Sequence, residues 1–134
     1  MKKKSNICVL TIHKGDIEKL KKTIFSVDTQ NIEPFKHIVL AKETCNYKIY
    51  FLKKKNREFI LNKKNDKSLY HAMNIIKKYS KNYPIIYLNS GDIFFCRRTL
   101  YYLDKFYRFF NLNYVLIFST LLRVNNFYFQ IKNN

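Results

Sequence analysis

The sequence is poor in acidic residues, glycine and proline. Of its 134 residues only 9 are Asp or Glu, against 26 Lys or Arg, so the formal net charge is +17. Such a charge favours an anionic partner, either nucleic acid or a membrane surface. The composition weakens this signal, because Lys, Asn, Ile, Tyr and Phe are abundant while Gly and Pro occur twice each, as an AT-rich coding sequence would produce. Charge alone therefore assigns no function.

Paired cysteines and long apolar runs are also missing. Cys8, Cys45 and Cys96 lie far apart and form no C-x-x-C pair, which argues against a zinc site or a disulfide framework and predicts reduced, mostly packed thiols. The longest apolar run, residues 114–122, is about half the roughly 18 residues that a membrane-spanning helix needs. No signal-peptide segment follows the basic N-terminus. We expect a cytoplasmic protein.

Apolar residues make up 47% of the chain and are spread along it, which predicts one folded domain over residues 1–134. Strand-like and helix-like patterns alternate, and a hairpin is expected around Asn125-Asn126. This order predicts an α/β fold in which helices flank a largely parallel central sheet. The predicted strands are residues 7–12, 35–41, 49–52, 85–88 and 114–119, and the predicted helices are residues 17–27, 68–79 and 100–110.

Polar residues follow two of the predicted strands. Thr11 and His13 end the first strand, and Asn89-Ser90-Gly91-Asp92 interrupts an apolar run after the strand at residues 85–88. Ligands of parallel sheets bind at such carboxyl ends. The residues alone leave two interpretations of Asp92 open with about equal weight: a turn residue or helix cap, or a ligand for a divalent ion that bridges phosphates.

Other polar residues carry weaker signals. Asp66 precedes a predicted helix and is typical of a helix start. His13, His37 and His71 have no metal-ligand spacing, so the residues alone favour structural or surface positions for all three.

Five segments of the chain, in order, resemble the family-2 glycosyltransferases of the colanic-acid and capsule type. DKSLYHAMN at residues 66–74 and PIIYLNSGDIF at residues 84–94 resemble the pattern D-K-G-I-Y-D-A-M-N followed by L-N-S-G-D-x-F. VLTIHKGDIE at residues 9–18 resembles the opening strand and turn of that family. TIFSVDTQ at residues 23–30 resembles its T-L-x-S-L-x-x-Q helix, and HIVL at residues 37–40 resembles its second strand.

The resemblance implies a GT-A fold, a Rossmann-like sheet that binds a nucleotide-sugar donor with Mn²⁺ or Mg²⁺. Asn89 and Asp92 would belong to the DXD-type motif, with Asp92 as the metal ligand, while Thr11, His13 and Asp66 would contact the nucleotide. The implied reaction is inverting glycosyl transfer to a saccharide or lipid-linked acceptor in polysaccharide or glycoconjugate biosynthesis.

The chain also departs from the family pattern. Ala41 replaces an aspartate at the end of the second strand, and no catalytic base can be nominated. After Asp92 the sequence has one acidic residue, Asp104, whose helical position favours a solvated or salt-bridging role. We therefore expect a truncated or split transferase: a donor-binding half that needs a second chain for the acceptor half, or a catalytically inactive remnant.

Two further partners follow from the charge. A nucleic-acid-binding module would use the lysines for phosphates and the aromatic residues for stacking, but the chain lacks the glycine and aromatic pattern of RNA-recognition sheets, which makes nucleic acid the weaker alternative. Peripheral contact with an anionic membrane through the lysine runs at residues 2–4 and 53–55 is compatible with a transferase.

Overall fold

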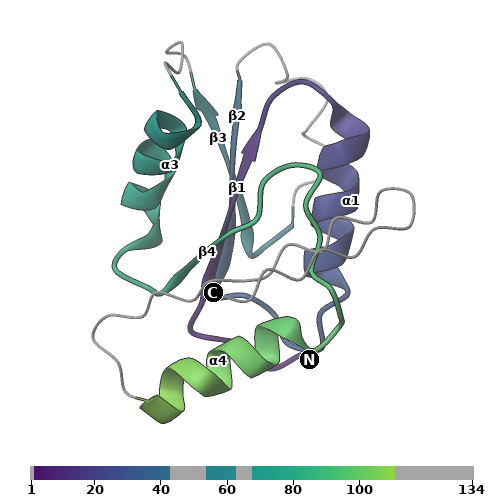
Figure 1. The fold of residues 1–134 in the computed structure, drawn as a ribbon, viewed down its shortest axis with the longest axis vertical. Coiled ribbons are helices and arrows are strands. Elements are labelled where there is room, and N and C mark those ends of the chain that lie inside the picture. Colours follow the sequence, from purple (N-terminus) through teal and green to yellow (C-terminus); the bar gives the residue numbers. More distant parts are fainter. Residues whose placement is uncertain (1, 43–53, 63–67, 111–134) are drawn as a thin grey trace, which may run out of the picture.

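The computed structural model describes residues 2–42, 54–62 and 68–110. Within them, four strands form one sheet in the order β3-β2-β1-β4, and each neighbouring pair is parallel. Helices flank this sheet (Figure 1), which confirms the predicted Rossmann-like α/β architecture. The elements are β1 (Cys8–His13), α1 (Ile17–Asp28), β2 (Lys36–Lys42), β3 (Arg57–Asn62), α3 (Leu69–Lys77), β4 (Ile85–Tyr87) and α4 (Thr99–Phe110).

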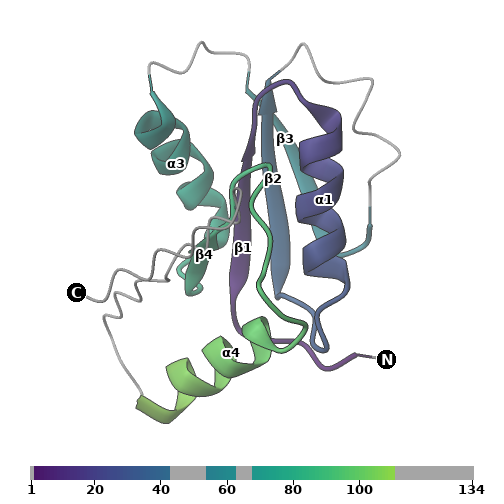
Figure 2. The same ribbon diagram turned by 45° about the vertical axis from the view of Figure 1, so that its right-hand side comes forward.

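Strand β1 lies inside the sheet, and all six of its residues are buried. Its side chains alternate between the two faces, as the pleat of a strand requires. Leu10 packs with Ala72 and Ile76 of α3, whereas Val9 packs with Leu100 at the start of α4. Helices α1 and α3 lie on opposite sides of the sheet (Figure 2). A continuous apolar run is therefore the pattern that this strand needs.

Helix α1 covers the sheet with an apolar stripe that includes Leu20 and Ile24, which pack against Val39 of β2. The helix begins as the sequence predicts. Gly15 has φ +94°, in the left-handed region that glycine adopts readily, and the Asp16 carboxylate accepts hydrogen bonds from two backbone N–H groups of the first turn. These signals fix the point at which the chain leaves β1 and enters the helix.

The predicted elements agree with the structure in most places where both can be compared. The exception is β3 (Arg57–Asn62), which the sequence patterns did not predict. They placed a strand at residues 49–52 instead, and that segment lies outside the described residues, as do the predicted strand at residues 114–119 and the C-terminal hairpin. Strand β3 is an edge strand with mostly half-buried residues, and its apolar run is short, covering only residues 59–61.

Helix α4 is anchored to the N-terminal segment through Asp104. This residue is 6% exposed, and its carboxylate accepts hydrogen bonds from the backbone N–H of Asn6 at 2.7 Å and from Arg108 at 2.8 Å. The predicted salt-bridging role is confirmed, whereas the alternative of a solvated carboxylate is wrong.

Two expectations from the composition can also be compared with the structure. Among the helices of the described segments, none is long and apolar enough to cross a membrane. Cys8 is buried, as expected, but Cys96 is exposed, which corrects the expectation of mostly packed thiols for the described part of the chain. Cys96 lies in the segment between β4 and α4, where the chain runs over the surface.

Candidate functional site

The candidate site lies where the carboxyl ends of β1 and β4 meet. Strand β1 pairs with β2 on one side and with β4 on the other, so the strand order reverses at β1. The pairing of β1 with the chain after β4 continues beyond the strand, because Ser90 N–H donates to the Ile12 carbonyl at 3.1 Å. The side chains join there too: His13 Nδ1 lies 3.0 Å from Ser90 Oγ. Such a switch point is the usual ligand position in open α/β sheets.

The turn at residues 89–92 is fastened to α1 by a single buried hydroxyl. Asp92 N–H donates to the Asn89 carbonyl at 2.9 Å, and Gly91 closes the turn at φ +103°. Thr23 Oγ1 accepts a hydrogen bond from Gly91 N–H at 2.9 Å. The same hydroxyl lies 2.8 Å from the Asp92 carbonyl and 3.2 Å from the Asn89 carbonyl, either of which can accept its proton. Thr23 thus fixes both ends and the middle of the turn.

Two more polar residues, Ser26 of α1 and Gln30 just after the helix, continue this attachment. Ser26 Oγ accepts a hydrogen bond from Phe94 N–H at 3.3 Å. Gln30 donates to the Cys96 carbonyl and accepts from Leu100 N–H, both at 2.9 Å. Polar residues of α1 and Gln30 therefore hold the chain from the end of β4 to the start of α4. This contact explains the spacing of Thr, Ser and Gln in the family-like helix pattern, to which sequence reasoning gave no structural role.

Asp92 is presented to solvent by the fixed turn. Its residue is exposed, and none of the described residues bonds its carboxylate. A carboxylate held by its backbone and free at its oxygens can take up a cation or a polar ligand without breaking an existing ion pair. The structure thus places the predicted metal ligand at the predicted edge of the sheet.

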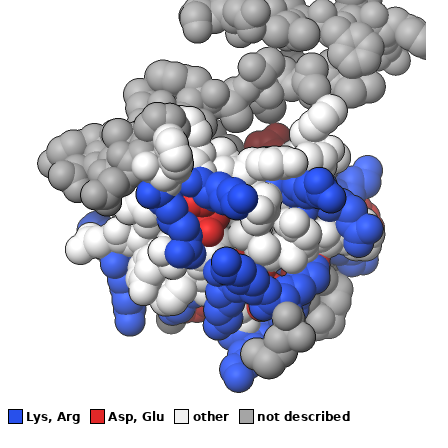
Figure 3. Space-filling view, turned by 90° about the horizontal axis from the view of Figure 1, so that it is seen from below, with Lys and Arg blue, Asp and Glu red and all other residues white. Residues whose placement is uncertain are grey.

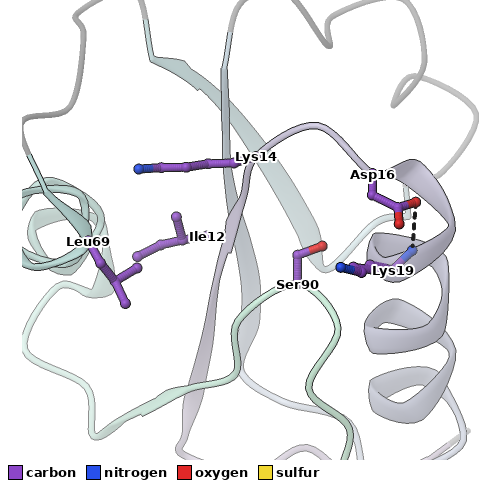
Figure 4. Close-up of a pocket in the computed structure, with 6 residues that line it drawn as sticks. All are labelled: Ile12, Lys14, Asp16, Lys19, Leu69 and Ser90. Carbon is purple, nitrogen blue, oxygen red and sulfur yellow. Dashed lines mark hydrogen bonds between the residues drawn. The ribbon is translucent and has the colours of Figure 1, made fainter.

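A pocket opens beside this turn (Figure 4), with a volume of about 220 Å³. Lys14 extends from the end of β1 across the pocket, and Lys19 extends from α1 towards Ser90. Sequence reasoning proposed neither lysine as a site residue, because both belong to a helix-start pattern in which lysines occupy solvated positions. The pocket is lined by Ile12, Lys14, Asp16, Lys19, Leu69 and Ser90.

His13 and Asn89 are held more deeply. His13 is 1% exposed, and burial lowers the pKa of its imidazole, although the nearby Asp16 carboxylate acts in the opposite direction. His13 Nε2 and Asn89 Oδ1 are buried and have no hydrogen-bond partner within the described residues. An unbonded buried polar atom costs about 1–3 kcal/mol, and such atoms call for an explanation in a folded protein. Both lie at the same switch point as the turn.

Thr11 lies beneath the site and belongs to a series of buried hydrogen bonds that crosses the sheet. Arg57 of β3 donates through Nε to His37 Nδ1 at 3.2 Å, so the proton of a neutral His37 lies on Nε2. That nitrogen is 2.9 Å from Thr11 Oγ1, which donates to the Leu88 carbonyl at 2.8 Å. The Arg57 guanidinium also binds Asp28 at the end of α1, at 2.6 Å. This series of hydrogen bonds ends at Leu88, the residue that precedes the turn.

The structure brings His13, Asn89 and Asp92 together at one edge of the sheet, with Thr11 one layer below. Asp66 lies outside the described residues. Ala41 is 1% exposed and packs against α1, so the position where the family pattern has an aspartate holds an apolar contact.

A divalent ion fits this edge only together with a bound ligand that supplies some of the atoms coordinating the ion. Within the described segments, no three His, Cys, Asp or Glu side chains come together as a metal site. Mg²⁺ in nucleotide sites, however, needs only one or two carboxylates and takes its other ligands from phosphates and water. Asp92 alone meets that requirement, so the residues present fit a metal that arrives with a diphosphate.

Positive charge is not confined to this edge. Figure 3 shows Lys and Arg side chains over much of the opposite, α4-bearing side of the molecule. Several acidic side chains are already paired: Asp28 with Lys54 and Arg57, and Asp104 with Arg108. The candidate site is therefore identified by its geometry and not by the net charge of the protein.

Neither the known family models nor the curated proteins contain a match to this chain. The proposed function therefore depends on the fold, the site and the resemblance of the five segments.

Proposed function

We propose that this protein binds a nucleotide-sugar donor at the carboxyl edge between β1 and β4, as the donor-binding part of an inverting glycosyltransferase of the GT-A type. The observation that carries the proposal is the turn at residues 89–92. Thr23 holds it rigidly at the switch point of the sheet and leaves the carboxylate of Asp92 open to a ligand.

The residues of the site suggest a division of roles. The metal, when it is bound with the donor, neutralises the charge of the departing diphosphate. Asp92 would hold the metal, and the polar atoms of His13 and Asn89 lie where the nucleotide or its sugar would be oriented. The proposal names no residue as the base that deprotonates the acceptor. It is limited to donor binding, with transfer assigned to this chain together with an acceptor-binding part.

The donor proposal predicts a metal-dependent thermal shift. UDP- or GDP-sugars at 100 times the dissociation constant would stabilise the fold by about 2.7 kcal/mol, which raises the melting temperature by several degrees. Asp92→Asn removes the charge that holds the metal, so the part of the shift that depends on Mn²⁺ is expected to disappear. Differential scanning fluorimetry with and without Mn²⁺ measures both parts.

Glu58→Gln is the matched control, because Glu58 is an exposed acidic residue of β3 that pairs with Lys36. This variant is expected to keep the full shift. The proposal is wrong if no UDP- or GDP-sugar shifts the wild type, or if Asp92→Asn keeps the Mn²⁺-dependent part. Salt-sensitive, submicromolar RNA binding without any nucleotide effect would favour the nucleic-acid alternative instead.

A further inference from the structure

Two lysines face the pocket beside the turn, and their charge has no acidic partner there. Lys14 follows β1 and Lys19 lies in the first turns of α1 (Figure 4). Across the described residues, no ion pair joins either ammonium to a carboxylate. The one acidic side chain that lines the pocket, Asp16, already accepts two backbone N–H groups as the cap of α1. Two ammonium groups and one carboxylate therefore line the pocket, which leaves it with a net positive charge.

The stem of Lys19, an exposed residue, lies beside the turn. A Cβ atom placed on Gly91 would lie 3.6 Å from Cδ of Lys19 and 3.8 Å from its Cβ and Cγ, so the aliphatic stem of the lysine runs along the turn. Packing of the stem restricts the rotamers of a side chain that is otherwise flexible. The ammonium group is thus directed towards Ser90 before any ligand arrives.

We propose that Lys14 and Lys19 bind the diphosphate of the donor directly, so that nucleotide binding does not require the divalent ion. This inference depends on the proposed function and adds to it the source of the charge that holds the phosphates. Ammonium groups form strong, charge-assisted hydrogen bonds to phosphate oxygens. The Ser90 hydroxyl, which shares the pocket, adds a neutral donor. The metal at Asp92 then strengthens a complex that already forms.

The experiment measures binding of UDP, GDP and inorganic pyrophosphate to the full chain by isothermal titration calorimetry, in EDTA and in Mn²⁺. In EDTA, UDP or GDP is expected to bind the wild type, and Lys14→Gln and Lys19→Gln are each expected to weaken binding about tenfold, because a hydrogen bond to a charged group is lost. Lys19→Arg keeps the charge and is expected to restore much of the affinity. Pyrophosphate is expected to bind more weakly than the nucleotides but with the same dependence on the lysines.

Lys22→Gln is the matched control. Lys22 is exposed on the same helix, three residues beyond Lys19, and does not line the pocket. The same substitution there tests the general effect of net charge and is expected to change the affinity less than twofold.

The outcomes separate this inference from the proposed function. Binding that occurs in Mn²⁺ but not in EDTA overturns the inference and leaves donor binding intact. Equal affinity in the wild type and in both pocket variants, or an equal loss in Lys22→Gln, also overturns it. Absence of UDP and GDP binding in both buffers overturns the inference and the proposed function together.

Discussion

Replacing Thr23 with valine is expected to destabilise the protein by about 3 kcal/mol and to abolish nucleotide binding. Valine keeps the branched shape, so the packing of α1 is preserved, but it removes the hydroxyl that accepts from Gly91 N–H and serves the carbonyls of Asn89 and Asp92. Thr23 is fully buried, and a buried backbone N–H left without an acceptor costs about 1–3 kcal/mol by itself. The turn then loses its fixed geometry, and Asp92 loses its position.

Urea unfolding and a nucleotide titration measure the two effects separately. Thr29→Val is the matched control, because Thr29 is the C-cap residue of α1 and its hydroxyl donates to a carbonyl of that helix, that of Phe25, at 2.9 Å. It is expected to cost less than about 1 kcal/mol and to leave binding unchanged. If Thr23→Val proves no more damaging than the control, the turn does not depend on α1, and the structural basis of the proposed site is lost.

The fold was predictable where local signals and long-range packing agree. Strand β1 begins as an apolar run and is buried throughout, and α1 begins at the glycine and aspartate that its sequence suggests. Strand β3 was missed for a physical reason. Its first residue is Arg57, whose buried side chain is held by Asp28 and His37. A pattern of apolar residues does not indicate a strand that begins with a buried, paired charge.

The site was predictable in position but not in construction. The interruption of the apolar run after β4 placed Asp92 at the carboxyl edge of the sheet. In parallel sheets this edge is where ligands bind. The residues that hold the turn could not be inferred, because Thr23 and Asp92 are 69 residues apart in the sequence. The signal was present as buried polar residues, Thr23 and Ser26 on α1 and Gln30 just after it. Only the folded chain shows what they bind.

Acid is expected to weaken the fold through His37. Burial, with a smaller contribution from the neighbouring Arg57 cation, lowers the pKa of His37 from an ordinary value of 6.5 to about 3. Between these pH values the unfolded chain binds a proton at this residue and the native protein does not. The stability is therefore complete above pH 6.5 and falls as the pH decreases towards 3, by about 1.4 kcal/mol per pH unit. Burial lowers the pKa of His13 too, which adds a loss of the same sign.

His37→Gln isolates the contribution of this residue, because a glutamine amide can accept from Arg57 and donate to Thr11 but does not titrate. The free energy of unfolding, measured in urea from pH 7 to pH 5, is expected to fall less steeply in the variant than in the wild type. Carboxylates titrate mostly below this range, so they disturb the comparison little. His71→Gln, at an exposed position of α3, is expected to keep the wild-type slope. An unchanged slope in His37→Gln would mean that His37 accepts a proton in the native protein. The donor and acceptor roles assigned to the hydrogen bonds between Arg57 and Leu88 would then be wrong, because a protonated imidazole cannot accept a hydrogen bond from Arg57.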